Sequence, residues 1–314
     1  MKTQPIENTD LVSSVLSYGC MRIAGTWNPS EVTPERDEAG QKAVFAAFDA
    51  GYTLFDHADI YCRSECEAIF GRALAKAPGM RKEIIISTKC GIRFSGDPNP
   101  DSPHRYDFSK SHILASCDKS LQKLGVETID IYQLHRPDLL MDPAEVAEAF
   151  DILKSAGKVR YFGVSNFLPS FVTALRSALP FRLVVNQVEI HLGRLACLYD
   201  GTLDQCLAEH ITPLSWSPLG GGFLGAGGTV EKDHPRKTVL DNLLKLLDEI
   251  AEKHGVSRTV ISLAWLLKHP SKIIPIVGSA NPERIKEATK AAEVELDREE
   301  WYRLLVAARG EGLP

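Results

Sequence analysis

The chain has 314 residues, 44% hydrophobic and 25% charged, which is the composition of a globular protein with a sizeable core. A net charge of -5 gives no electrostatic reason to expect a nucleic acid or an anionic membrane as partner. The first ten residues are polar, and no window approaches the roughly 18 uncharged apolar residues of a membrane span, so we expect a cytoplasmic protein. The seven cysteines are irregularly spaced without a C-x-x-C pair, which is typical of reduced thiols rather than disulfides or a zinc site.

Taken in chain order, the first third of the sequence alternates between strand and helix patterns. Residues 11–25 mix apolar and small side chains and predict one or two short strands. Apolar residues then recur with helical spacing over 37–50, and a short strand follows at 53–56. The alternation continues with a helix at 64–76 and a buried, β-branched strand at 83–89.

The same alternation runs to the end of the chain. After a loop rich in Pro, Gly and Asp at 91–107, we predict strands at 128–135, 159–166, 183–191, 212–217 and 272–279. The predicted helices of this part are 109–125, 143–156, 169–179, 200–210, 239–254, 258–269, 282–292 and 297–308. Glycine dominates 220–228.

Eight strands, each followed by a helix, indicate a parallel sheet that can close into a (β/α)8 TIM barrel. An open doubly wound sheet uses the same alternation, but the strand count and the absence of a composition break favour one closed domain over residues 1–314. We expect an N-terminal β-hairpin and extra helices after strand 7 and at the C-terminus.

Titratable residues stand at the ends of three consecutive predicted strands. Asp56, Lys89 and His135 terminate these strands, and Tyr61 lies just past the first of them. Alone, each has a structural explanation as a helix cap, a solvated strand end or a core histidine. In a barrel, however, the carboxyl ends of the strands meet at one mouth, so the four groups would converge there.

Such a set suits proton transfer to a carbonyl oxygen. A Tyr hydroxyl with a pKa of about 10 is a slow acid near neutrality, and a lysine beside it lowers that pKa. A carboxylate keeps the lysine charged and oriented, and a histidine can hydrogen-bond and orient the substrate oxygen.

Several segments together resemble the aldo-keto reductase family. They are FDHADIY, ISTKCGI, YQLHRPD, GVSNF, VNQVEIH and SWSPLGGG, in that order, with SYGCMRIA before them and PIVGSANPERIKEA after them. The resemblance implies an NADPH-dependent oxidoreductase that reduces an aldehyde or ketone to an alcohol without a Rossmann domain. It also implies that Tyr61 is the general acid, that Lys89 and Asp56 tune it, and that His135 orients the carbonyl.

The same resemblance assigns cofactor contacts. Ser165, Asn166 and Gln187 match residues that hold the nicotinamide carboxamide, and Trp216 matches an aromatic ring stacked on the nicotinamide. The loop that begins with Ser217, Pro218 and Leu219 and runs through Gly220 to Gly225, including Gly221, matches a segment along the pyrophosphate. Gly278, Ser279 and Arg284 match the adenosine end, where Arg284 can fork onto a 2′-phosphate.

Three positions depart from the family pattern. Cys62 follows the tyrosine where glycine is usual, Gly278 replaces a common lysine, and Ala288 replaces a common asparagine. The last two weaken the expectation of NADPH over NADH. Substrate specificity should come from loops expected at the mouth, 22–31, 91–107 and the residues near Phe223, but their composition names no substrate. Trp27, Phe94 and Tyr106 in these loops can form an apolar wall or pack the loops shut. The sequence leaves the oligomeric state open, and the resemblance favours a monomer.

Three other interpretations compete with this one. The segment GGGFLG at 220–225 formally fits a dinucleotide fingerprint, but no helix follows it directly. Asp56, His57, His135 and His191 suggest a metal-dependent hydrolase, but His57 should face away from Asp56, and Lys89 would repel a cation. An NADPH-binding regulatory subunit with little turnover, as in potassium-channel β-subunits, stays open.

Overall fold

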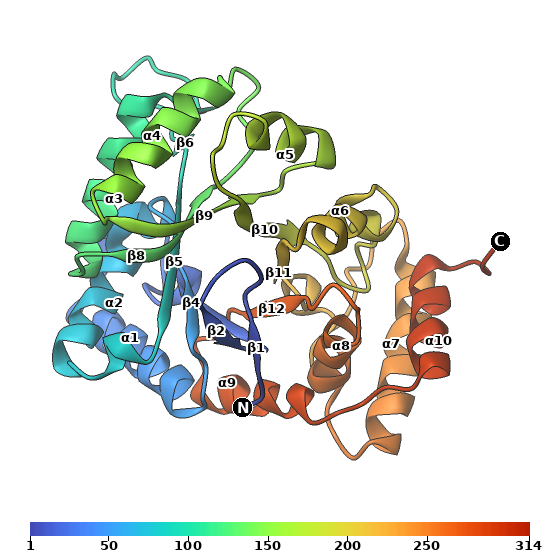
Figure 1. The fold of residues 1–314 in the computed structure, drawn as a ribbon. Coiled ribbons are helices and arrows are strands. Elements are labelled where there is room, and N and C mark those ends of the chain that lie inside the picture. Colours follow the sequence, from blue (N-terminus) through green and yellow to red (C-terminus); the bar gives the residue numbers. More distant parts are fainter.

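Eight short parallel strands close into a barrel in the computed structural model, which describes residues 1–314 (Figure 1). In chain order the strands are β3 (Ser17–Gly19), β4 (Leu54–Asp56), β5 (Ile85–Cys90), β8 (Ile129–Leu134), β9 (Val159–Ser165), β10 (Leu183–Glu189), β11 (Thr212–Trp216) and β12 (Ile274–Val277). The first strand, β3, pairs with β4 on one side and with β12 on the other, which closes the sheet. The predicted (β/α)8 architecture is confirmed, and the open doubly wound alternative is wrong.

A helix follows each barrel strand and packs on the outside of the sheet. These helices are α1 (Pro34–Asp49), α2 (Glu65–Lys76), α3 (Lys110–Leu124), α4 (Pro143–Ser155), α5 (Pro169–Arg176), α6 (Thr202–Glu209), α8 (Arg258–Leu267) and α9 (Pro282–Ala288). Their starts follow local chemistry. The Thr33 side chain accepts the Arg36 backbone N–H before α1, and Pro34 occupies the first turn, where no N–H is needed.

Two further helices stand where the sequence predicts them, α7 (Lys237–Lys253) after β11 and α10 (Arg298–Arg309) at the C-terminal end. They lie side by side at one edge of the molecule (Figure 1). Trp265 on α8 and Trp301 on α10 stack with ring centres 5.0 Å apart. Each indole N–H donates to the backbone carbonyl of the other residue, which joins α10 to the barrel. None of the helices combines the length and apolar character needed to cross a membrane.

Two antiparallel strand pairs accompany the barrel. β1 (Thr3–Pro5) and β2 (Val12–Ser14) form the expected N-terminal hairpin, and β6 (Ile92–Arg93) pairs with β7 (Arg105–Tyr106) in the loop after β5. Short 3-10 helices occupy several connections, at Cys20–Arg22, Pro29–Glu31, Tyr61–Ser64, Met80–Lys82, Ala196–Leu198, Gly220–Gly222 and Thr289–Ala292.

The N-terminal hairpin closes one end of the barrel. Ile6 and Leu11 from its turn are buried against the apolar residues that fill the barrel interior, among them Leu54, Ile131 and Leu214. Because Leu54 begins β4, the hairpin covers the amino ends of the strands. The polar strand ends are therefore left facing the other, open end.

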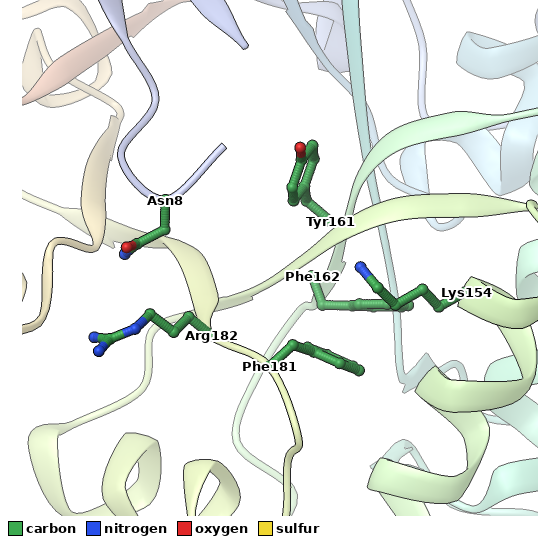
Figure 2. A pocket seen from close by; sticks show the side chains of 6 residues that line it. All are labelled: Asn8, Lys154, Tyr161, Phe162, Phe181 and Arg182. Atoms are coloured by element: carbon green, nitrogen blue, oxygen red, sulfur yellow. The ribbon is translucent and has the colours of Figure 1, made fainter. Parts of the chain in front are cut away.

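A small cavity of about 260 Å³ lies at the closed end of the barrel, between the hairpin turn and the start of β9 (Figure 2). Its lining consists of Asn8, Lys154, Tyr161, Phe162, Phe181 and Arg182. None of the residues predicted to carry chemistry lies there.

Candidate active site

Alternation along β4 turns Asp56 toward the inside of the barrel. Leu54 packs in the barrel interior, whereas Phe55 points outward and meets Phe70 of α2 with ring centres 5.2 Å apart. Because successive side chains of a strand point to opposite faces, Asp56 faces inward again, now at the carboxyl end. His57 faces outward onto Phe70, with ring centres 4.4 Å apart.

Strand register brings Lys89 and His135 to the same place. Asp56 pairs with Ser87 of β5, so Lys89 stands two residues further along and points inward as well. Lys89 in turn pairs with Gln133 of β8, and His135 follows two residues beyond that. Each strand is thus offset from its neighbour, which is the stagger that a closed barrel requires.

The Lys89 ammonium is the centre of the resulting cluster. Its Nζ donates to Asp56 Oδ1 and Oδ2, both at 2.8 Å, and to the His57 carbonyl at 2.6 Å. It also donates to the Tyr61 hydroxyl oxygen at 3.3 Å. Lys89 is fully buried, so these contacts replace its water shell.

Burial and charge oppose each other in this cluster. Burial lowers the pKa of Lys89, but the charges of Asp56 and Tyr61 outweigh it, and the net shift is upward, which keeps the ammonium charged. Burial likewise raises the pKa of Tyr61, and the Lys89 charge opposes that shift without cancelling it. The prediction that lysine lowers the tyrosine pKa therefore holds for the contribution of Lys89 and is wrong for the net direction.

The Tyr61 hydroxyl has a free proton. Its oxygen accepts from Lys89, and it donates to no protein group. The ring stands edge-on between Trp27 and His135, with ring centres 6.3 Å and 6.0 Å away. Tyr61 is only 8% exposed, and it lines the large cavity described below.

His135 is a neutral imidazole beside this hydroxyl. Burial lowers its pKa well below the usual range, and the charges of Lys89 and Arg136 lower it further. Its Nδ1 is buried and has no hydrogen-bond partner. A neutral ring can hydrogen-bond an oxygen without adding a charge to the site.

The histidines proposed for the metal alternative are not brought together. His57 lies on the outside of the barrel, and burial lowers its pKa to about 3. His191 accepts the Gly193 backbone N–H through Nδ1 and does not line the cavity. The set of one aspartate and three histidines is therefore not assembled.

Three consecutive residues after Tyr61 adopt left-handed backbone conformations. The φ angles are 46° at Cys62, 51° at Arg63 and 71° at Ser64, although none of them is glycine. Hydrogen bonds hold the segment in place, since Ser64 Oγ donates to the Asp59 carbonyl and the Asp59 N–H donates to the Lys89 carbonyl. These left-handed conformations are a source of backbone strain immediately next to the tyrosine.

Across the barrel mouth, a polar chain links the ends of β8, β9, β10 and β11. Ser165 Oγ donates to the Gln187 carbonyl at 2.9 Å. The Asn166 amide donates to Ser165 Oγ at 2.8 Å and to the His135 carbonyl at 3.3 Å, and its oxygen accepts from Trp216 Nε1 at 2.9 Å. Asn166 has φ of 61°, a conformation that asparagine tolerates better than most residues.

Gln187 joins this chain to the lysine cluster. Its Nε2 donates to Asp56 Oδ2 at 3.2 Å, and its Oε1 is buried without a partner. A buried amide oxygen with no donor is uncommon and costs free energy unless a ligand satisfies it.

A cavity of about 480 Å³ opens at the carboxyl end of the barrel. Every predicted site residue lines it except Lys89, which is enclosed behind Asp56 and Tyr61. These lining residues are Asp56, Tyr61, His135, Ser165, Asn166, Gln187, Trp216, Ser217, Pro218, Leu219, Gly221, Gly278, Ser279 and Arg284.

The far part of the cavity has the features of a phosphate and nucleoside cradle. Gly221 has φ of 71°, and a Cβ there or at Gly278 would meet no atom within 4 Å, so both backbones are open to a ligand. Arg284 is exposed, lines the cavity and forms no ion pair. Together with the unsatisfied Gln187 oxygen, these groups fit a dinucleotide with an amide at one end and phosphates along its length. The dinucleotide fingerprint interpretation of 220–225 is wrong, because a 3-10 turn follows β11 and the next α-helix begins only at Lys237.

Two of the three aromatic residues expected at the mouth do not line the cavity. Trp27 does, but Phe94 lies under the Arg63 guanidinium at 4.7 Å, and Tyr106 packs near His104. Phe223 packs on His191, with ring centres 6.2 Å apart. Phe94 and Phe223 thus pack on residues of neighbouring loops, and Tyr106 packs within its own loop.

Other lining residues were not among the predicted site residues, although Arg22 and Ile92 belong to loops expected at the mouth. The most distinctive are Arg22 and Arg136, together with the apolar Met21, Ile60 and Ile92. Arg136 directly follows His135, so the turn past β8 could have indicated it.

The closed barrel of eight parallel strands and the polar residues at its open end agree with the family that the sequence resembles. The family model of the aldo/keto reductase family matches residues 15–307, and the chain belongs to that family. The protein is therefore an NAD(P)H-dependent oxidoreductase of carbonyl or sugar-like compounds.

Individual relatives agree with this assignment. The chain is 42% identical to the oxidoreductase YcsN of Bacillus subtilis over 97% of each chain. It is 41% identical to a 6-dehydroglucose reductase of Novosphingobium aromaticivorans over 92% of each chain. Among solved structures, a glycerol dehydrogenase of Gluconobacter oxydans superposes with a TM-score of 0.85 at 25% identity, covering 99% of this chain and 97% of the other.

Proposed function

We propose that the protein reduces an aldehyde or ketone to an alcohol, with NADPH as reductant and Tyr61 as the proton donor. The observation that carries this proposal is the Tyr61 hydroxyl, which accepts from Lys89 and donates to no protein group at the wall of the cavity. Its proton is thus free for a substrate oxygen.

Lys89 and Asp56 prepare this donor. When Tyr61 gives up its proton, a negative charge develops on its oxygen, 3.3 Å from the Lys89 ammonium. A charge already in place stabilises that oxygen without reorganisation, and Asp56 keeps the ammonium protonated and aimed. Asp56 is therefore a counter-ion rather than a second acid.

His135 orients the carbonyl in this proposal. A neutral imidazole close to Tyr61 can hydrogen-bond the substrate oxygen, so that the oxygen faces the phenol. The Asn166 amide bonded to the His135 carbonyl supports the turn that carries the ring.

The other half of the cavity holds the cofactor. A bound nicotinamide dinucleotide supplies the hydride. Ser165, Asn166 and Gln187 offer donors and acceptors for its carboxamide, and Trp216 offers an aromatic face. Ser217, Pro218, Leu219 and Gly221 would lie along the diphosphate of the cofactor. Gly278, Ser279 and Arg284 would lie at its adenosine end.

We propose NADPH rather than NADH because the exposed Arg284 guanidinium has no protein partner and suits a 2′-phosphate. Replacing Arg284 with Gln should raise the KM for NADPH with little effect on the KM for NADH. Residues 1–314 would act as one domain, as a monomer in the cytoplasm.

The substrate is a small carbonyl compound. The relative named for 6-dehydroglucose supports including a hydroxylated aldehyde among the candidates. The test is to mix the protein with NADPH and a panel of aliphatic, aromatic and hydroxylated aldehydes and follow the loss of NADPH absorbance. Consumption that needs both protein and aldehyde supports the proposal, whereas tight NADPH binding with a silent panel would favour a regulatory subunit.

A further inference from the structure

Two arginines line the cavity without any role in the proposed chemistry. Arg22 follows β3 and Arg136 follows β8, and neither side chain forms a hydrogen bond or an ion pair with the protein. The Arg136 guanidinium instead lies 5.3 Å from the centre of the Trp216 ring. Stacking on the indole holds the cation in place while its N–H groups keep no protein acceptor.

The positive charge on this side of the cavity is not balanced. Asp56 and Glu287 are the carboxylates among the lining residues. Lys89 already neutralises Asp56, and Glu287 belongs to α9 near Arg284, at the proposed adenosine end. Two guanidinium charges in the cavity that Tyr61 lines therefore remain without a counter-ion.

Arg22 follows one of the strands that neighbour the catalytic residues, and Arg136 lies at the border between the substrate side and the cofactor side, because it follows His135 and its guanidinium faces the Trp216 ring. The strands β3, β4, β5 and β8 are neighbours in the barrel. Arg22 follows β3, Asp56 ends β4 with Tyr61 just after it, Lys89 lies in β5, and Arg136 follows β8. The residues proposed to hold the cofactor stand at the carboxyl ends of the other four strands, β9 to β12, or after them. A ligand atom that meets Arg136 beside His135 is thus close to the place where the carbonyl is held.

The same loops also contribute apolar side chains to the cavity. Trp27, Ile60 and Ile92 line the cavity and follow β3, β4 and β5. Such a wall accommodates a short carbon skeleton, and the guanidinium groups complement a negative group at its end.

We propose that Arg136, assisted by Arg22, binds an oxyanion on the substrate, a carboxylate or a phosphate linked to the carbonyl by a short carbon chain. The inference rests on the proposed carbonyl reduction and names its substrate class. One hydride and one proton add across the carbonyl to give the alcohol, and the oxyanion takes no part in bond making or breaking.

The test compares aldehydes that differ in charge. One pair is glyceraldehyde 3-phosphate and glyceraldehyde, and the other is 4-oxobutanoate and butanal, each measured with NADPH. We expect kcat/KM to favour the charged member of at least one pair by about tenfold or more, the effect of one charge-assisted hydrogen bond. The pair with the larger preference tells phosphate from carboxylate.

The variants Arg136→Gln and Arg22→Gln test the residues separately. Arg136→Gln should reduce the preference for the charged member by about tenfold, so that most of it is lost, and Arg22→Gln should reduce it less. Arg298→Gln on α10 makes the same charge change at an exposed position outside the cavity and should leave the preference unchanged.

Each failure has a different meaning. No turnover of any aldehyde would overturn the proposed function itself. Equal turnover of the charged and neutral members by the unaltered protein would overturn only the oxyanion site. The site would also be overturned if Arg136→Gln weakened NADPH binding, measured by fluorescence titration, and left the preference between aldehydes intact.

Discussion

Lys89 Nζ lies 2.8 Å from each carboxylate oxygen of Asp56, and both side chains are almost completely enclosed by the barrel. Such a pair contributes little net stability, because the loss of water offsets the attraction between the charges. Removing one partner is different, since the other charge is then left buried and alone.

The first prediction follows from this pair. Lys89→Met should lower the free energy of unfolding by about 3 to 5 kcal/mol, and the double variant Asp56→Asn with Lys89→Met should recover much of that loss. Both should lose carbonyl reduction by at least about 100-fold, because Tyr61 has lost its charged neighbour. Urea unfolding and turnover measure the two effects, and a double variant no more stable than the single one would contradict the coupling.

The second prediction concerns pH. Only protonated Tyr61 can act as the acid, and burial raises its pKa above the ordinary value of 10.0, so this form persists from neutral pH to above pH 9. The pKa of His135 lies well below 6.5, so this residue does not change charge near neutrality. We expect kcat for reduction to be nearly flat from about pH 6 to 9.

The matched control for the pH profile is His135→Gln, which keeps a hydrogen-bonding side chain and cannot titrate. It should have a lower kcat and a profile of the same shape. An inflection near pH 6.5 that the unaltered protein shows and His135→Gln loses would mean that a charged imidazole takes part.

The third prediction concerns the left-handed segment after Tyr61. Cys62 has φ of 46°, which glycine adopts without strain and alanine does not. Cys62→Ala removes the buried thiol and keeps the strain, whereas Cys62→Gly removes both. The Gly variant should therefore be more stable than the Ala variant by about 1 kcal/mol in thermal or urea unfolding. Equal stabilities would show that the backbone is not strained there.

The fourth prediction concerns acid stability. Burial lowers the pKa of His57 to about 3 in the folded protein, against 6.5 for the ordinary group. Below pH 6.5 the unfolded chain binds a proton at His57 that the folded chain excludes, so stability is present above this pH and is lost as pH falls toward 3.

His57→Phe removes this titration and keeps an aromatic ring against Phe70. Its free energy of unfolding should fall less steeply between pH 6.5 and 4.5 than that of the unaltered protein, as measured by urea unfolding at each pH. Parallel curves for the two proteins would show that groups other than His57 cause the loss of stability at low pH.

Much of the fold and the polar strand ends could be predicted from the sequence because both follow from local pattern. Buried β-branched runs such as 83–89 alternate with amphipathic helices, and in a parallel barrel all strand ends meet at one mouth. That rule brings Lys89 and Asp56 to the same mouth, and the register of β4 and β5 then places them side by side. The outward orientation of His57 follows from the period of a strand.

Other features depend on tertiary structure. The direction of the Tyr61 pKa shift is set by the balance between burial and the charge of Lys89, and burial is not visible in the order of residues. Phe94 and Tyr106 pack in the β6–β7 loop because Arg63 and His104 are near them in space. Arg136 stands out only when its lack of an acidic partner is known.

The most direct test of the central claim is Tyr61→Phe. This change removes one oxygen and leaves the ring that packs between Trp27 and His135. The account predicts that kcat for carbonyl reduction falls by about 100-fold or more while the affinity for NADPH, measured by fluorescence titration, stays within a few-fold. Retained turnover in a folded Tyr61→Phe protein would contradict the assignment of Tyr61 as the proton donor.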